Sequence, residues 1–280
     1  MNTSRCLVAL LALALSAPAA AFGRLGNAED LLNLGQRAAK ANQPITEQEE
    51  IDLGRGVAAN VLGAAPLVAD AELQRYVNRV GLWVAMQSER PGLPWRFGVI
   101  DSSDVNAFAM PGGTILITAG LYDRLRDESE LASVLGHEIA HVVRKHHVKA
   151  IQGAMGREFA TEVAGDMAGQ SNNELVRRFG DKAFRAGTEV LARGLDKRDE
   201  YDADQRGMVL AARAGYNPFG LAGVLQTLDS ADASDRRVAL LFSTHPTPAS
   251  RIERLEASVG EKLDPYAGQP SPGRLYRAKK

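Results

Sequence analysis

One short segment of the sequence has the residue types and the spacing of a metal-binding motif. His137, Glu138 and His141 form a His-Glu-x-x-His pattern, and the apolar residues before them recur at helical spacing. Because residues four apart share one face of a helix, both imidazoles can reach one metal ion, and Glu138 projects beside them toward a water molecule at the metal. We interpret the motif as a zinc site; a chance match on an amphipathic helix is the alternative.

A catalytic zinc ion also needs a third protein ligand, and His147 is the first candidate. It stands six residues after His141, which is the spacing of the third ligand in metzincins. That arrangement requires a glycine three residues after the second histidine to turn the chain, but Arg144 stands there. We therefore expect the helix to continue, with His146 and His147 as surface residues that point away from the metal.

The second candidate ligand is Glu200, which lies in a predicted helix over residues 197–214. Asp204 lies four residues later on the same face, so one carboxylate can ligate the metal while the other accepts a hydrogen bond from a liganding imidazole. This is the gluzincin pattern. Acidic residues also favour the first turn of any helix, but their occurrence together with the His-Glu-x-x-His motif favours ligation.

The elements that must position these residues are mainly helices. Apolar periodicity predicts helices over residues 46–62, 70–86, 128–150, 158–167, 173–192, 197–214, 218–228 and 248–259. Residues 95–100 and 114–118 are predicted strands, because they alternate or are rich in β-branched side chains. A Pro-Gly-Gly turn at 111–113 separates them. We therefore expect a mainly α-helical, α+β fold with a small antiparallel β-sheet.

Composition and charge restrict the class of protein. The 280 residues include 33 Lys and Arg against 34 Asp and Glu, and the net charge of -1 disfavours nucleic-acid binding. Arg5, an apolar run and small residues up to Ala21 have the order of a cleavable signal peptide over residues 1–21. No later run is long and apolar enough to span a membrane. We expect a soluble domain with the zinc site over residues 22–264 and a flexible tail over residues 265–280.

Four motifs in order give the chain a resemblance to a known family. They are Asn-Ala-Phe-Ala-Met-Pro-Gly-Gly at 106–113, Leu-Ala-Ser-Val-Leu-Gly-His-Glu-Ile-Ala-His at 131–141, Glu-Tyr-Asp-Ala-Asp at 200–204 and Ser-Thr-His-Pro at 243–246. Over nearly all of the predicted domain, the chain resembles the CAAX prenyl endopeptidase-like family of zinc metallopeptidases, especially its soluble periplasmic BepA-like branch. The resemblance implies a zincin-like metalloprotease fold. We expect none of the tetratricopeptide repeats that some members carry, because the sequence ends soon after the last predicted helix.

The resemblance implies a role for each residue of the metal site. It makes His137, His141 and Glu200 the ligands of one zinc ion per chain. It makes Glu138 the general base that acts on the zinc-bound water, and it makes Asp204 a supporting residue behind the ligands.

The resemblance also implies a substrate cleft. It places Asn106, Ala107 and Phe108 along this cleft, where an edge strand can pair with an extended peptide. It places His245 near the metal, where the imidazole either occupies the open metal position in a resting state or contacts the oxyanion of the substrate.

A secreted zinc endopeptidase is the main functional expectation. By resemblance and from the signal peptide, its substrates are unfolded or misassembled envelope or outer-membrane proteins in the periplasm, where it serves protein quality control. The alternative is a zinc-stabilised, chaperone-like module that holds polypeptides in a closed or latent site, with His245 as a fourth ligand. The presence of Glu138 argues against this alternative, since a purely structural site has no need of that carboxylate. Only the resemblance disfavours a zinc hydrolase of non-peptide bonds.

Overall fold

The computed structural model describes residues 44–154, 187, 189–231, 235–267 and 275–277. In chain order, the elements are α4 (Glu47–Ala64), α5 (Ala71–Ala85), β1 (Arg96–Ile100), β2 (Ala107–Met110), β3 (Thr114–Thr118), α6 (Ala119–Tyr122), α7 (Glu128–Val143), α10 (Lys197–Arg213), α11 (Gly220–Asp229), α12 (Arg236–Thr244), α13 (Pro248–Ser258) and the 3-10 helix η1 (Gly260–Tyr266). The structure confirms the predicted mainly helical α+β class. The predicted signal peptide, the predicted helix over 158–167 and most of that over 173–192 lie outside the described residues.

The three-stranded sheet is mixed rather than antiparallel, with the strand order β1-β3-β2. β1 pairs with β3 in parallel, with Arg96 opposite Thr114, and β2 runs antiparallel to β3. The expected antiparallel pairing of β1 with β3 is wrong because the turn at 111–113 joins β3 to β2, a strand that we had not predicted. Gly112 and Gly113 in this turn have φ of 75° and 103°, which glycine adopts without strain. This topology leaves β2 at an edge of the sheet.

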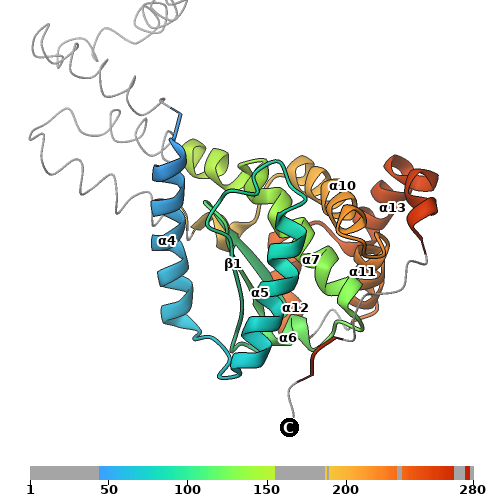
Figure 1. The fold of residues 1–280 in the computed structure, drawn as a ribbon, viewed down its shortest axis with the longest axis horizontal. Coiled ribbons are helices and arrows are strands. Elements are labelled where there is room, and N and C mark those ends of the chain that lie inside the picture. Colours follow the sequence, from blue (N-terminus) through green and yellow to red (C-terminus); the bar gives the residue numbers. More distant parts are fainter. Residues whose placement is uncertain (1–43, 155–186, 188, 232–234, 268–274, 278–280) are drawn as a thin grey trace, which may run out of the picture.

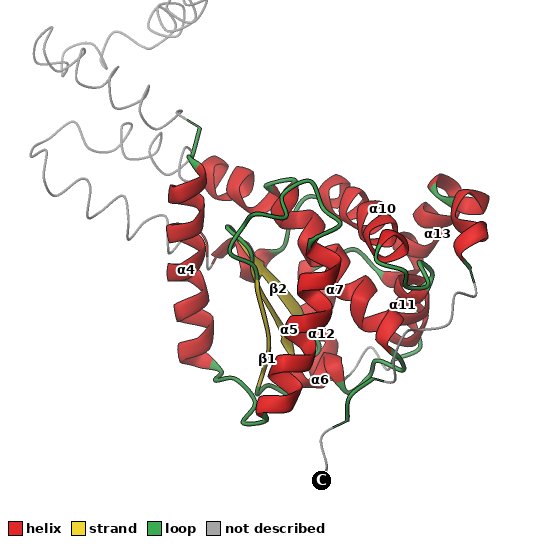
Figure 2. Cartoon of the chain, viewed as in Figure 1, coloured by secondary structure: helices red, strands yellow, loops and turns green. Residues whose placement is uncertain are grey.

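Helices cover both faces of the sheet (Figure 1). Alternate side chains of a strand point to opposite faces. Phe97 and Ile115 belong to the core cluster that the strands share with α5 and α7. Ile100 and Leu116 pack instead with Val57 of α4. The sheet therefore lies between α4 on one face and α5 and α7 on the other, as Figure 2 shows.

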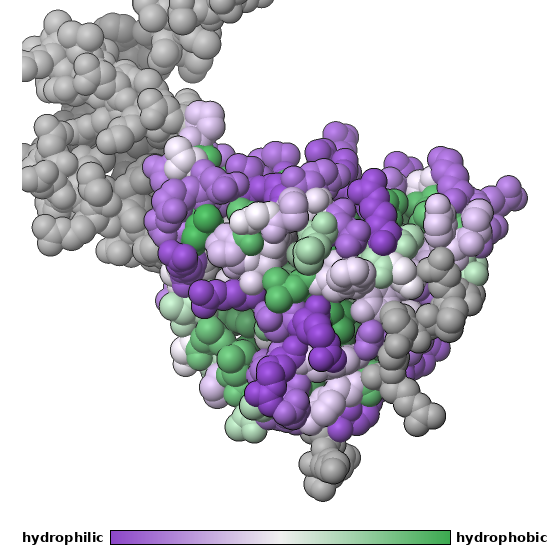
Figure 3. Space-filling view, viewed as in Figure 1, coloured by the Kyte–Doolittle hydropathy of each residue, from purple (hydrophilic) through white to green (hydrophobic). Residues whose placement is uncertain are grey.

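The surface of the described residues is largely polar. On the face in Figure 3, hydrophilic residues predominate and hydrophobic residues appear in small groups. Exposed large apolar side chains include Leu67, Trp83 and Met86. Among the helices that the structure describes, none has the length and apolar character needed to cross a bilayer.

Residues 275–277 lie within the predicted flexible tail, and they contact the core. Leu275 is buried. The Tyr276 hydroxyl donates a hydrogen bond to Asp70 Oδ2 at 3.2 Å, and the Tyr122 hydroxyl donates to the Tyr276 carbonyl. These contacts hold this part of the chain against the start of α5 and the end of α6.

Two glycines let α7 and α10 approach each other closely. A Cβ atom on Gly207 of α10 would lie 2.7 Å from the backbone nitrogen of His137, and one on Gly136 of α7 would lie 2.8 Å from the carbonyl oxygen of Gly207. Both distances are shorter than a carbon atom tolerates in a packed interior. The close approach places the His-Glu-x-x-His motif of α7 opposite Glu200 and Asp204 of α10.

We expect Gly207→Ala to lower the free energy of unfolding by about 1–3 kcal/mol, the usual range for overpacking. The added methyl group meets backbone atoms that cannot rotate away, and this outweighs the roughly 1 kcal/mol that alanine gains over glycine in a helix. Urea unfolding of the purified protein measures the effect. Gly63→Ala in α4 is the matched control, because a Cβ atom at that position would meet nothing within 4 Å; it should be neutral or stabilising. A Gly207→Ala variant as stable as wild type would contradict the expectation.

Candidate metal centre

Three candidate metal ligands converge where α7 and α10 face each other. His137 and His141 project from α7, and Glu200 projects from the first turn of α10. His137 Nε2 lies 3.1 Å from His141 Nε2 and 3.7 Å from Glu200 Oε2. His141 Nε2 lies 3.5 Å from Glu200 Oε1. All three side chains are buried. Because their donor atoms lie within these short distances, they can hold one metal ion.

A carboxylate and a guanidinium fix the ring of His137 from behind. Asp204 Oδ1 lies 2.8 Å from His137 Nδ1, so the Nδ1–H donates and Nε2 is left for the cluster. Arg251 of α13 binds both carboxylate oxygens of Asp204, with Nε 2.9 Å from Oδ2. Burial raises the pKa of Asp204, but Arg251 and His137 outweigh it and hold this pKa below its ordinary value. Sequence reasoning missed Arg251, because an arginine in an amphipathic helix carries no local signal of burial.

The chain turns sharply after α7, and this corrects the prediction for His146 and His147. Lys145 adopts a positive φ of 58°, and a second helical stretch begins directly after it. Both imidazoles are buried, and their rings lie 5.1 and 5.5 Å from the ring of His141. The expected continuous helix with surface histidines is therefore wrong. The turn is held by Glu50 of α4, whose carboxylate lies 3.1 Å from Lys145 Nζ.

Burial and near neighbours set the charges of the cluster. Burial and the imidazole of His137 hold the pKa of His141 well below its ordinary value, so its ring is neutral. Burial raises the pKa of Glu200, but His245 and His137 outweigh it and lower this pKa to about 2. Burial raises the pKa of Glu138 above its ordinary value. The two carboxylates therefore differ in protonation behaviour: Glu200 stays an anion, whereas Glu138 can accept a proton.

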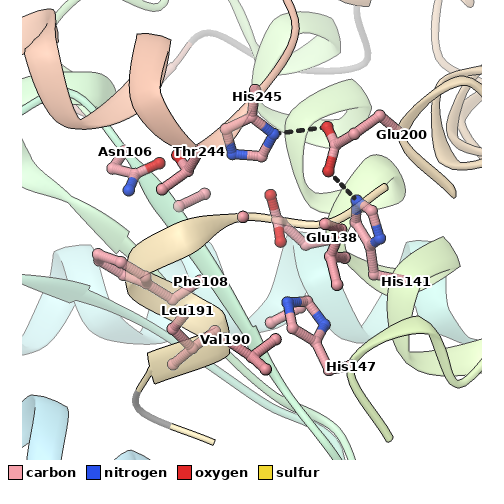
Figure 4. A pocket seen from close by; sticks show the side chains of 14 residues that line it. Asn106, Phe108, Glu138, His141, His147, Val190, Leu191, Glu200, Thr244 and His245 are labelled. Carbon is pink, nitrogen blue, oxygen red and sulfur yellow. Dashed lines mark hydrogen bonds and ion pairs between the residues drawn. The ribbon is translucent and has the colours of Figure 1, made fainter. Parts of the chain in front are cut away.

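His245 closes one side of the cluster. It is the residue that follows α12, a helix that we had not predicted. Its Nδ1 lies 2.6 Å from Glu200 Oε2 (Figure 4). The ligand atoms of His137, Glu200 and His245 lie within 4.8 Å of one another. His245 can therefore act as a further donor to the same metal ion.

Glu138 faces a small cavity that the predicted substrate-binding residues also line (Figure 4). Asn106, Ala107 and Phe108 lie at the start of the edge strand β2. The cavity volume is about 20 Å³, which has room for a water molecule but not for a peptide. The buried Asn106 Oδ1 accepts no hydrogen bond from the residues that the structure describes. Such an acceptor suits a substrate N–H group.

Comparisons with known proteins agree with this geometry. The model of the family described as Peptidase family M48 matches residues 71–259. The chain belongs to peptidase family M48. This M48 chain is 28% identical over 263 residues to the beta-barrel assembly-enhancing protease of Escherichia coli (strain K12), covering 90% of this chain and 50% of that protein. It is 31% identical over 167 residues to metalloprotease LoiP of the same strain, covering 59% and 62%. It is 28% identical over 189 residues to mitochondrial metalloendopeptidase OMA1 of Schizosaccharomyces pombe, covering 66% and 53%.

The family match confirms the resemblance drawn from the four motifs. The matched residues contain all of them, from Asn106 to Pro246. The family and the names of the relatives confirm the predicted class, a metalloendopeptidase, and imply a metal cofactor. The M48 chain spans about half the length of the first of these relatives.

Proposed function

We propose that the M48 chain is a zinc-dependent endopeptidase of the cell envelope, in which His137, His141 and Glu200 hold one zinc ion and Glu138 is the general base. The observation that carries this proposal is the position of Glu138. It is a buried carboxylate that lines the same cavity as His141 and Glu200. Hydrolysis needs a proton acceptor at this place, whereas a structural zinc site does not.

The donor set fits zinc. Two imidazole nitrogens and one carboxylate are a usual ligand set for catalytic zinc, which keeps a fourth position open. Metal-ligating histidines usually donate their other N–H to a carboxylate or a similar acceptor. His137 has Asp204 as such a partner. The partner of His141 is His146, and the Nδ1 atoms of the two rings lie 3.0 Å apart.

The residues of the site can share the work of peptide hydrolysis. Bound zinc supplies Lewis-acid chemistry, which polarises the scissile carbonyl and lowers the pKa of a water molecule. Glu138 takes the proton of the attacking water at its carboxylate and later delivers it to the leaving amine. The edge strand β2 pairs with the extended substrate, and Asn106 Oδ1 accepts a hydrogen bond from it. His245, once released from Glu200, can donate to the oxyanion.

The proposed substrates are unfolded or misassembled envelope or outer-membrane proteins, and the proposed compartment is the periplasm. The signal-peptide pattern over residues 1–21 supports the compartment. The similarity to proteases named for enhancing β-barrel assembly supports the substrates and a part in protein quality control.

A closed holding module is the second candidate function. The contact between His245 and Glu200 and the small cavity favour it, because both leave little room for a peptide at the metal. In that case the site would hold zinc, and the chain would bind polypeptides without turnover. The same two observations also fit a latent protease that has to open before it cuts.

Zinc content and casein hydrolysis distinguish these functions. We expect one zinc ion per chain and cleavage by the wild type, or by His245→Ala alone if this residue blocks the site. A zinc chelator should abolish the cleavage, and added zinc should restore it. If zinc is bound but neither protein cuts, the result counts against the endopeptidase and favours the holding module. If no zinc is bound, the metal assignment is wrong.

A further inference from the structure

His141 lies beside three of the other four histidines of this chain. The sequence has five, at positions 137, 141, 146, 147 and 245. The ring of His141 lies 4.6 Å from that of His137, 5.1 Å from that of His146 and 5.5 Å from that of His147. On its Nδ1 side it has one hydrogen-bond partner among the described residues, His146 Nδ1 at 3.0 Å. The partner of this candidate ligand is thus an imidazole, whereas the partner of His137 is a carboxylate.

The geometry of this pair restricts the positions of the protons. Two ring nitrogens 3.0 Å apart form a hydrogen bond only if one carries a proton and the other does not. His141 Nε2 faces His137 Nε2 and Glu200, where a metal ligand must be unprotonated. A neutral His141 therefore carries its proton on Nδ1 and donates it to His146. It follows that His146 Nδ1 is the acceptor and that its Nε2 carries a proton.

The surroundings of His146 are complementary to that tautomer. The side chain is buried, and its Nε2 lies 3.5 Å from Asp199 Oδ1 and 3.5 Å from Asp202 Oδ2. Asp202 is held in turn by Arg144 Nε and Arg206 Nε, each at 3.0 Å. Two carboxylates on the Nε2 side favour a proton there and so leave Nδ1 free to accept. The Nδ1 of His146 thus faces the Nδ1–H donor of His141, and its Nε2–H faces carboxylate acceptors.

We propose that His146 is a positioning residue for His141. It accepts the Nδ1–H of His141 and donates its own Nε2–H toward Asp199 and Asp202, and so it orients the His141 ring and keeps Nε2 available for zinc. The proposal rests on the proposed function in one respect, the assignment of His141 as a zinc ligand. His147 provides a contrast, because its ring is about as close to His141 but its buried Nδ1 has no partner among the described residues.

A pair of near-isosteric variants tests the hydrogen bond separately from packing. In His146→Asn the amide oxygen can take the place of Nδ1 as an acceptor, whereas His146→Leu fills similar space without one. Zinc affinity is measured on the metal-free protein by competition with a chromophoric chelator. We expect His146→Leu to bind zinc about 10–100-fold more weakly than wild type, the usual effect of losing a partner of a metal ligand. His146→Asn should recover most of this loss, and His147→Leu, the control, should retain wild-type affinity.

Each outcome separates this inference from the proposed function. If the wild type binds no zinc, the proposed function fails first. If the wild type binds zinc and both His146 variants bind it equally well or equally poorly, the positioning role is wrong. Nitrogen-15 NMR of the zinc-loaded wild type is an independent check that needs no variant to fold. We expect a proton on Nε2 of His146 and on Nδ1 of His141, and a proton on Nδ1 of His146 would overturn the proposal.

Discussion

Glu138→Gln is expected to lower kcat on a peptide substrate by about 10²–10⁴-fold, the usual contribution of a general acid–base residue. Glutamine has nearly the same shape as glutamate, but its amide cannot take a proton from the attacking water. The carboxylate is buried beside the candidate ligands, and burial raises its pKa. Because the position is buried, a base from the solvent cannot easily take its place. Steady-state kinetics with a quenched fluorescent peptide measures the loss, and metal analysis of the same sample reports the zinc content.

The variant should retain its zinc, because Glu138 is not among the three proposed ligands. Glu253→Gln is the matched control, since Glu253 is exposed on α13 and should leave turnover unchanged. Wild-type turnover by Glu138→Gln would show that another group is the base. Loss of zinc together with turnover would show that Glu138 ligates the metal.

Glu50→Ala is expected to destabilise the fold by about 3–5 kcal/mol, the usual effect of removing one partner of a buried ion pair. The Glu50 carboxylate is fully buried and lies 2.8 and 3.0 Å from two nitrogens of Arg90 and 3.1 Å from Lys145 Nζ. It also accepts a hydrogen bond from Gly112 N at 3.3 Å. Burial raises the pKa of Glu50, but Arg90 and Lys145 outweigh it and hold this pKa below its ordinary value. Without the carboxylate, the guanidinium of Arg90 remains largely buried with one partner fewer.

Urea unfolding of Glu50→Ala measures this effect, and Asp52→Asn on the same helix is the matched control. Asp52 forms an exposed ion pair with Arg55 at 3.3 Å, and exposed pairs contribute less than about 1 kcal/mol. Glu50 also holds Lys145, the residue at the turn that places His146 beside His141. We therefore expect Glu50→Ala to displace His146 and so to weaken zinc binding. Equal stability of the two variants would contradict the role of Glu50.

Local periodicity was enough to predict those parts of the candidate site that lie within one helix. His137 and His141 share a face of α7, and Glu200 and Asp204 share a face of α10, because a helix brings residues four apart together. The structure brings all four side chains together. The same reasoning failed one turn later, where it extended the helix through Arg144.

In the sheet, too, local features could be predicted from the sequence and the pairing of distant segments could not. The β-branched run over 114–118 and the turn at 111–113 were recognisable, because both depend on neighbouring residues. The pairing of the strands was not, since β1 is parallel to β3 only because β2 lies between them in sequence and forms a hairpin with β3. Strand pairing depends on contacts over long stretches of chain, and propensity carries no information about them.

Sequence patterns were sufficient to predict the family, the two helices that carry the candidate ligands and the grouping of His137 with His141 and of Glu200 with Asp204 on those helices. Tertiary contacts were needed to show that His146 and His147 turn back toward His141 and that Arg251 is buried behind Asp204, because these positions depend on partners remote in sequence. Lys145 is held in a left-handed turn by Glu50 of α4, and Arg251 comes from α13, so no local pattern around either residue encodes its environment.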